Sequence, residues 1–412
     1  MMTATRTIRA RPDSPGDSAG GSPSTGWSRR KMLRAMGLGA ATVVVAGAGT
    51  LSYRVFDSAV LDPGGGDAYA PWQSWRDTPG PLGAVAAAVL AASPHNTQPW
   101  IFGVGAQVID LYVDRTRTTG TVDPFAREQF VGLGCAVENL VLGCRVRGLE
   151  PTVTWLPDGP DGDRVANVAL ADRTAGSNPL YDAIGDRHTN RGPYDGRPVP
   201  DDLLTSLVDR SDPQPGLAVH WITDPDTRGV LGGLLVDAAT ALTADEQQST
   251  DGFVWFRGSN DDIQRYRDGL VLDGQGLGPL TLGAAKLLPA SSRTAGDKFW
   301  VDQTRTVHTA TAAAYGVITA TDPDSRRTQL DAGRLLQRIH LRATTQGVAL
   351  QHMNQITERI DRESATGAAP TFAPRFAALL PGVGAPLLTF RVGYPVRPAH
   401  TTPRRSVAEV TR

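Results

Sequence analysis

A cluster of polar side chains lies in residues 93–100, which read Ser-Pro-His-Asn-Thr-Gln-Pro-Trp. The side chains that could contact a ligand are those of Ser93, His95, Asn96 and Gln98. Two prolines fix φ and lack a backbone N–H, so the segment is not expected to be helical, and the residue before each proline is expected to be extended. Planar amides carry donors and acceptors that suit the edge of a heterocycle. The sequence predicts a stiff ligand-binding loop; the alternative is an ordinary polar loop capped by the tryptophan.

A second group of residues suits an anion. Arg187 and Arg191 are four residues apart, and the hydroxyl of Thr189 lies between them. Guanidinium groups match phosphate oxygens in a two-point fashion, and the hydroxyl can donate a third hydrogen bond. A solvated basic turn is the usual alternative for such an arginine pair.

Composition excludes several classes of protein. The 412 residues are enough for two domains or one large two-lobed unit, and the formal net charge of −1 gives no basic field for nucleic acid. Cys135 and Cys144 lie on one helical pattern, roughly 13 Å apart along the axis, and cannot pair with each other. No cluster with zinc-ligand spacing and no Gly-x-Ser-x-Gly motif occurs, so no metal site is predicted.

The N-terminal 56 residues differ from the rest of the chain. Residues 1–27 are rich in Gly, Ser, Pro and Thr and are expected to be disordered. Arg29-Arg30 followed by the charge-free run 35–53 indicates a twin-arginine export signal. The run is about long enough to cross a membrane, and no convincing small-x-small cleavage site follows it, so it is a candidate anchor. A chance Arg-Arg before a buried helix is the alternative.

The remaining chain predicts mixed helices and strands. A Gly/Pro-rich linker, residues 57–80, carries Trp72 and Trp75, which are expected to contact the domain surface. Residues 246–300 are the least regular part and suggest an inserted, lid-like excursion. The elements expected are helices over 126–147, 227–242, 301–319 and 326–345, and strands over 152–156, 165–171, 217–223, 348–353 and 386–392.

The sequence around Gly148 is weakly repeated around Gly347. Aligning Gly148 with Gly347 places Gly134 on Gly333 without gaps. In each copy a long amphipathic helix is followed by a glycine stop and then a strand. Chance agreement of two amphipathic helices is the alternative.

Residues 93–100 resemble the flavin-ring loop of the nitroreductase family, and the form Ser-Pro-His-Asn-Thr-Gln-Pro-Trp is similar to that of its Acg-type branch. Residues 187–191 resemble the family's Arg-x-Ser/Thr-x-Lys/Arg segment, and Arg404-Arg405 resembles its C-terminal basic pair. The resemblance implies that residues 187–191 hold the phosphate and ribityl chain of FMN and that Arg404-Arg405 closes on the same phosphate. By spacing more than identity, it also implies that Met353 and Asn354 line the central flavin ring.

The resemblance implies an α+β, nitroreductase-like fold of two fused halves, residues 81–175 and 176–412. The ring loop occurs only in the first half and the Arg-x-Thr-x-Arg segment only in the second. Ordinary members build each flavin site from two subunits, so this chain is expected to be an intramolecular pseudo-dimer, a monomer with one FMN.

The implied activity is electron transfer through FMN from a small-molecule donor to a small organic acceptor. No side chain need act as acid or base, because the flavin does the chemistry. The export signal counts against NAD(P)H as the donor outside the cytoplasm. Two alternatives stay open: a flavin-binding or storage protein whose FMN is occluded by residues 246–300, and a scaffold without a cofactor.

Overall fold

The computed structural model of the chain describes residues 64–208, 214–288 and 291–412. The predicted arm, export signal and membrane segment, all within residues 1–56, lie outside the described residues. Among the described residues, only α5 (Arg127–Val146) is long and apolar enough to cross a membrane, and 89% of that stretch is buried inside the protein.

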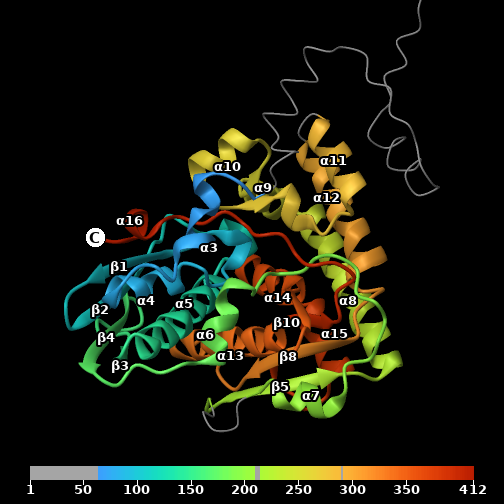
Figure 1. Ribbon diagram of the computed structural model, residues 1–412. Coiled ribbons are helices and arrows are strands. Elements are labelled where there is room, and N and C mark those ends of the chain that lie inside the picture. The colour runs from blue at the N-terminus through green and yellow to red at the C-terminus, as the bar shows by residue number, and fades with distance from the viewer. Residues whose placement is uncertain (1–63, 209–213, 289–290) are drawn as a thin grey trace, which may run out of the picture. The chain divides into compact units, whose positions relative to one another are not determined.

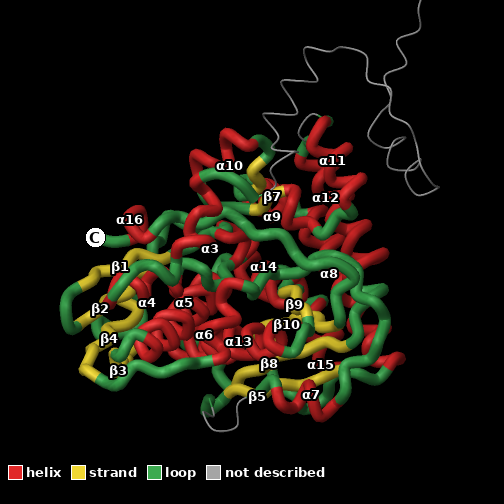
Figure 2. Tube along the Cα trace, in the orientation of Figure 1, coloured by secondary structure: helices red, strands yellow, loops and turns green. Residues whose placement is uncertain are grey.

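Two four-stranded antiparallel sheets have the same strand order (Figures 1 and 2). The first has the order β1 (Trp100–Val104), β2 (Val108–Val113), β4 (Arg164–Asp172), β3 (Leu149–Trp155). The second has the order β5 (Leu217–Ile222), β8 (Ala314–Ala320), β10 (Ala385–Gly393), β9 (Ala349–His352). In both, a long helix separates the second strand from the third along the chain. This repeated topology confirms the predicted α+β fold with two similar halves.

The two long helices, α5 and α13 (Arg326–Thr345), pack against each other at closely approaching backbones. A Cβ atom on Gly134 would overlap the carbonyl oxygen of Leu330, and one on Gly333 would overlap that of Val131. The two contacts are reciprocal and keep the register of the predicted repeat. Gly148 and Gly347, with φ of 77° and 67°, follow the two helices at equivalent positions. The structure therefore confirms the repeat.

Chain segments cross between the halves. Thr411 of the second half, after α16 (Val407–Val410), forms a parallel bridge with Phe102 of β1 in the first half. Within the second half, Thr189 forms one with Leu350 of β9. One hydrophobic core contains residues of both halves, including Leu140 and Ile339. Both cysteines are free and buried, as predicted.

Residues 246–300 are more regular than expected. They contain α9 (Glu246–Phe253), β6 (Phe256–Arg257), α10 (Asn260–Tyr266), β7 (Leu270–Val271), α11 (Pro279–Leu287) and most of α12 (Arg293–Gln303). They follow α8 (Pro225–Ala244), which was predicted.

The helix predicted over residues 301–319 is wrong. Helical structure ends with a π-helical turn at Thr304–His308, and β8 follows. Every residue of β8 is buried between β5 and β10. The alanines before it favoured a helix, but pairing on both sides and the β-branched residues Val317, Ile318 and Thr319 favour the strand.

The linker contacts the body through its aromatic residues, as predicted. Its described part contains α3 (Ala70–Ser74) and leads into α4 (Gly80–Ala88). Trp75 is buried against Tyr181, and the indole N–H of Trp72 donates a 2.7 Å hydrogen bond to the carbonyl of Thr402. The remaining helices that bear on the site are α14 (Gln355–Thr366) and α15 (Phe372–Leu379).

Candidate functional site

The loop 93–100 joins α4 to β1 and has a strained backbone. Ser93 is extended, as predicted, with φ −149° and ψ 155°. His95, Asn96 and Gln98 have positive φ values of 45°, 56° and 51°, and Pro94–Asn96 forms a short 3-10 turn. The expectations of no helical turn and of an extended Gln98 are therefore wrong. The Gln98 N–H donates to the Ser93 hydroxyl at 3.0 Å, which helps to hold the strained backbone.

The side-chain amide of Asn96 connects three segments of the chain. Its Nδ2 donates to the carbonyls of Gly269 at 3.2 Å and Pro403 at 2.9 Å, and its Oδ1 accepts from Arg404 at 2.5 Å. Gly269 belongs to the excursion, residues 246–300, whereas Pro403 and Arg404 belong to the C-terminal tail that follows β10. The amide that the sequence predicts to face a ligand is bonded to the chain itself.

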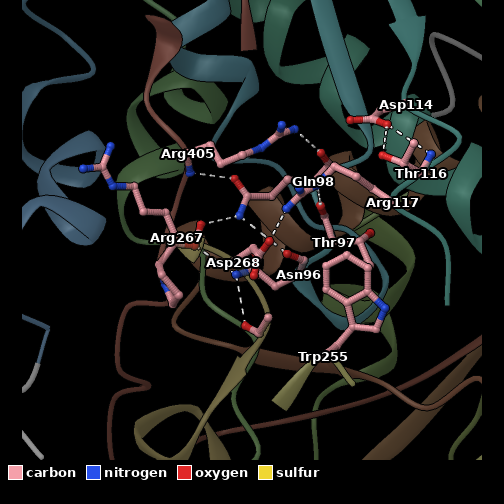
Figure 3. A network of polar contacts seen from close by, with 12 residues as sticks. Asn96, Thr97, Gln98, Asp114, Thr116, Arg117, Trp255, Arg267, Asp268 and Arg405 are labelled. Atoms are coloured by element: carbon pink, nitrogen blue, oxygen red, sulfur yellow. Dashed lines mark hydrogen bonds and ion pairs between the residues drawn. The ribbon is translucent and has the colours of Figure 1, made fainter. Parts of the chain in front are cut away.

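Gln98 is fully buried and makes a second connection to the same segments (Figure 3). Its Nε2 donates to the carbonyl of Arg267 at 2.8 Å, and its Oε1 accepts from the backbone N–H of Arg405 at 2.8 Å. The Arg405 guanidinium donates to the carbonyls of Gln98 and Trp100 at 2.5 and 3.1 Å. In this arrangement Gln98 and Arg405 hold the tail on the loop.

The excursion is also held against the first half by a buried carboxylate. Asp268 lies between Arg117 and Arg257, with its two oxygens paired to different guanidinium groups. Arg257 donates at 2.8 and 2.6 Å to one oxygen. The side chain of Asp268 is only 4% exposed. Its two buried ion pairs therefore fix residues 267–269 next to the loop.

The predicted anion-binding segment runs along the edge of β9. Arg187 is 2% exposed, donates to the carbonyl of Leu90 at 3.0 Å and contacts His340 Nδ1 at 3.4 Å. Thr189 pairs with β9, and Arg191 donates to the carbonyl of Gly274 at 3.2 Å. The fold thus brings this segment of the second half close to the end of α4 in the first half.

Five buried or half-buried guanidinium groups lie along the edge of β9 and at the loop 93–100, and are called the guanidinium cluster below. They belong to Arg187, Arg191, Arg391, Arg404 and Arg405. Across the part of the chain that the structure describes, none of them forms an ion pair with a carboxylate. The Nε atoms of Arg187, Arg404 and Arg405 are buried without a hydrogen-bond partner. Buried charges are normally paired, so this set lacks an anion.

Burial lowers the pKa of each of these guanidinium groups. The pKa of Arg187, of Arg191 and of Arg405 falls to about 10, and that of Arg404 falls well below its ordinary value. Like charge adds to the effect, because Arg404 lies near Arg187 and Arg191 lies near Arg391. A bound anion would counter both causes.

Five buried or half-buried histidines lie in the same region. Burial, with nearby arginines, lowers the pKa of His95 to about 4 and of His188 and His352 to about 3. The pKa values of His308 and His340 fall well below the ordinary value for the same reasons. All five are therefore neutral at physiological pH and serve as hydrogen-bonding groups.

Sequence reasoning missed all of these histidines except His95, and it did not place Arg391 in the site. Arg391 on β10 donates to the carbonyls of Asn190, Gly192 and His308 and stacks 4.0 Å over the ring of Tyr194. It therefore holds the segment that follows Arg187. His188 lies within the predicted segment 187–191 and could have been included with it, whereas His308 and His340 lie outside every motif identified in the sequence.

Met353 and Asn354 differ in what they can contact. Met353 is 2% exposed and packs with Ile356 and Phe372 in a second hydrophobic cluster, so its side chain is a core side chain. The side-chain oxygen of Asn354 accepts from the backbone N–H of Thr389 at 3.1 Å.

The arrangement fits one end of FMN more clearly than the other. Phosphate oxygens accept from guanidinium N–H groups, and the cluster has buried N–H groups without acceptors. At the ring end, the amides of Asn96 and Gln98 are already bonded to the excursion and the tail. Arg187, Thr189, Arg191 and Arg404 are thus the residues best suited to hold the phosphate.

Replacing Asn96 by alanine is expected to loosen the tail. The substitution removes the hydrogen bonds that the amide makes to Gly269, Pro403 and Arg404. The free energy of unfolding should therefore fall by about 1–3 kcal/mol. Hydrogen exchange of residues 402–406 and 267–271 should accelerate while far-UV circular dichroism is unchanged. Asn167→Ala is the control, because it removes only a 2.7 Å bond to Asp110 in the first sheet. Unchanged exchange in Asn96→Ala would contradict this role.

Comparisons with known proteins identify relatives that span both halves. The chain is 25% identical over 329 residues to "Putative NAD(P)H nitroreductase Rv3131" of Mycobacterium tuberculosis, covering 78% of this chain and 88% of that protein. It is 23% identical over 333 residues to "Putative NAD(P)H nitroreductase acg" of the same species, covering 79% and 93%.

A solved nitroreductase with bound FMN from Desulfitobacterium hafniense aligns with 56% of this chain and 95% of its own, at 15% identity and a TM-score of 0.33. No family model matches the chain.

Proposed function

Because this chain is an Acg-type relative of the nitroreductases, we propose that it is an FMN-dependent oxidoreductase of nitroreductase type. In this proposal, one bound FMN passes electrons to a small organic acceptor. The observation that carries the proposal is the guanidinium cluster without carboxylate partners where the loop and residues 187–191 meet. A phosphate dianion is the ligand that such a cluster would stabilise most.

We propose one FMN per chain, held within an intramolecular pseudo-dimer. The loop 93–100 belongs to the first half, and Arg187, Arg191 and Arg404 belong to the second. The equivalent segment of the second half, before β5, has no Asn-x-Gln-Pro-Trp sequence. Each half therefore lacks what the other contributes, and a single complete site follows.

The residues of this chain would bind and orient the cofactor, whose ring carries hydride or electrons when bound. Arg187, Arg191 and Arg404 would fix the phosphate, and the neutral imidazole of His95 would donate or accept at the ring end. The excursion, bonded to the loop through Gly269 and Arg267, would exclude water. The same bonds favour the second candidate function, a storage protein whose occluded FMN turns over little.

The proposed partners are a small-molecule donor and acceptor, with no nucleic acid. The names of the relatives support NAD(P)H as the donor. We also propose export by the twin-arginine route, with attachment to a membrane through residues 35–53, on the sequence of that segment alone. The two proposals conflict, since NAD(P)H is not expected outside the cytoplasm. Whether NADPH reduces the bound flavin is therefore the first question to test.

An absorbance spectrum of the purified protein, taken before and after NADPH is added under argon, tests the proposal. About one FMN per chain, bleached by NADPH and re-oxidised by a quinone or nitro compound, is the expected result for the enzyme. A flavin that dithionite reduces but that NADPH and acceptors do not affect would favour storage. No flavin after soaking with FMN would refute both functions.

A further inference from the structure

One tryptophan of the linker is in contact with the guanidinium cluster. Trp72, on α3, is half-buried, and the guanidinium of Arg404 lies over its indole ring, with Cζ 4.9 Å from the ring centroid. The ring of His188 meets the same indole at 4.6 Å between centroids, edge to face, with an interplanar angle of 62°. The indole therefore joins the C-terminal tail to residues 187–191, the two segments best suited to hold a phosphate.

The indole supplies a negative group to a guanidinium that lacks one. Arg404 is 3% exposed, and its printed acceptors within the described chain are all neutral: the Asn96 amide at 2.5 Å, the Thr402 hydroxyl at 2.7 Å and the carbonyls of Pro403 at 2.9 Å and Ala91 at 3.4 Å. Its Nε is buried without a hydrogen-bond partner. The face of an aromatic ring attracts a cation within about 6 Å of its centroid. Trp72 thus stabilises a buried charge that no carboxylate neutralises.

Hydrogen bonds hold the linker in this position. The backbone N–H of Arg404 donates to the carbonyl of Ala68 at 2.7 Å, and the indole N–H of Trp72 donates to the carbonyl of Thr402 at 2.7 Å. The linker and the tail therefore lie side by side (Figure 1). In addition, the side-chain oxygen of Gln264, on α10 of the excursion, accepts from the N–H of Ala68 at 3.0 Å. Bonds to both the tail and the excursion thus fix the indole in place.

His188 connects the indole to the first arginine of the segment 187–191. Arg187 can only donate hydrogen bonds, so its 3.4 Å contact makes Nδ1 of His340 an acceptor. The hydrogen of that neutral imidazole is then on Nε2, which donates to the carbonyl of His188 at 3.3 Å. A change at the indole therefore reaches Arg404 directly and Arg187 through the two histidines.

We propose that Trp72 is a positioning residue of the cofactor site, through which the linker gives this site its preference for a flavin that carries a phosphate. This inference rests on the proposed function. The indole keeps the guanidinium of Arg404 buried and oriented before the anion arrives, so less order is lost when the anion binds. Riboflavin has the ring and the ribityl chain of FMN but no phosphate. The contribution of Trp72 therefore belongs to the affinity for FMN and not to that for riboflavin.

Titration of FMN and of riboflavin into the cofactor-free protein measures this preference. Trp72→Ala should weaken FMN binding roughly tenfold and change riboflavin binding by less than about twofold. Trp72→Phe keeps an aromatic face for Arg404 and should recover most of the lost affinity. Trp75→Phe is the control on the same linker, because the Trp75 ring contacts Tyr181 and Arg76, neither of which belongs to the guanidinium cluster. This control should keep the wild-type preference for FMN.

Two results of these titrations would overturn the proposal. Equal losses of FMN and riboflavin affinity in Trp72→Ala would show that the indole only supports the fold. FMN binding as weak in Trp72→Phe as in Trp72→Ala would show that the aromatic face is not the group that positions Arg404.

Inorganic phosphate separates this proposal from the proposed function. Phosphate pairs with guanidinium groups and would neutralise the charge over the indole, so it should shift the tryptophan emission of the cofactor-free wild type. Trp72→Phe should lose most of this shift, whereas Trp75→Phe should keep it, and chloride at equal ionic strength should not produce it. If this pattern appears but no flavin binds, the proposed function fails and the role of Trp72 beside an anion stands. If flavin binds and turns over but phosphate leaves the emission unchanged, or shifts it equally in Trp72→Phe, the role of Trp72 is refuted and the proposed function stands.

Discussion

The double variant Arg187→Ala/Arg191→Ala is expected to purify without FMN and to bind it roughly 10²–10⁴-fold more weakly than the wild type. Each arginine would contribute a charge-assisted hydrogen bond to the phosphate, and each such bond is worth about 1.5–3 kcal/mol. Isothermal titration of FMN into the apoprotein measures the change.

The fold of this variant should survive. The arginines carry buried charges without carboxylate partners in the described part of the chain, so their removal relieves a desolvation cost in the cofactor-free protein. The lost bonds to Leu90 and Gly274 oppose this gain. The unfolding midpoint without FMN should consequently change little, whereas the increase that FMN produces in the wild type should disappear.

A control must separate the position of the charges from their number. Arg115→Ala/Arg173→Ala removes two positive charges from exposed side chains that pair with Asp163 and Glu150 in the first half. This variant should keep about one FMN per chain. Stoichiometric FMN in Arg187→Ala/Arg191→Ala, or equal loss in the control, would remove these arginines from the phosphate site.

The parts of the fold that local pattern determines were predictable. The long helices α5 and α13 have apolar residues at helical spacing and glycine stops with positive φ, and both were predicted within two residues. The strand β8 was not predicted from the sequence. It is a strand because β5 and β10, from distant parts of the sequence, pair with it on both sides. Non-local pairing overrides the helix propensity of neighbouring alanines.

The candidate site divides in the same way. The sequence identified the segments that carry a contiguous motif: the loop 93–100, residues 187–191 and Arg404-Arg405. It could not show that Asn96 and Gln98 bond to the tail and the excursion, since their partners lie 169 to 308 residues away. It also missed Arg391 of β10 as a site residue, because its bonds to Asn190 and Gly192 join parts of the chain about 200 residues apart.

The close approach of α5 and α13 leads to the second large prediction. Gly134→Ala should lower the free energy of unfolding by about 3 kcal/mol, because the new methyl group would overlap the rigid backbone carbonyl of Leu330 and the helices must separate. For a chain of this length, the unfolding midpoint should fall by roughly 3–5 °C in calorimetry. FMN binding should weaken as well, since the loop and the arginines belong to different halves. Gly233→Ala on α8 is the control: its Cβ meets nothing within 4 Å, so it should stabilise by about 0.5–1 kcal/mol.

A substitution at Gly333, on the other helix, tests the same contact from its other side. Gly333→Ala should cost about as much as Gly134→Ala, because its Cβ would overlap the carbonyl of Val131 at the equivalent place. Once one substitution has separated the helices, the second meets less resistance, so the double variant should lose clearly less stability than the sum of the single losses. Additive losses would show that the two positions act independently. That result would contradict a single close contact as the element that joins the halves and fixes the arginines opposite the loop.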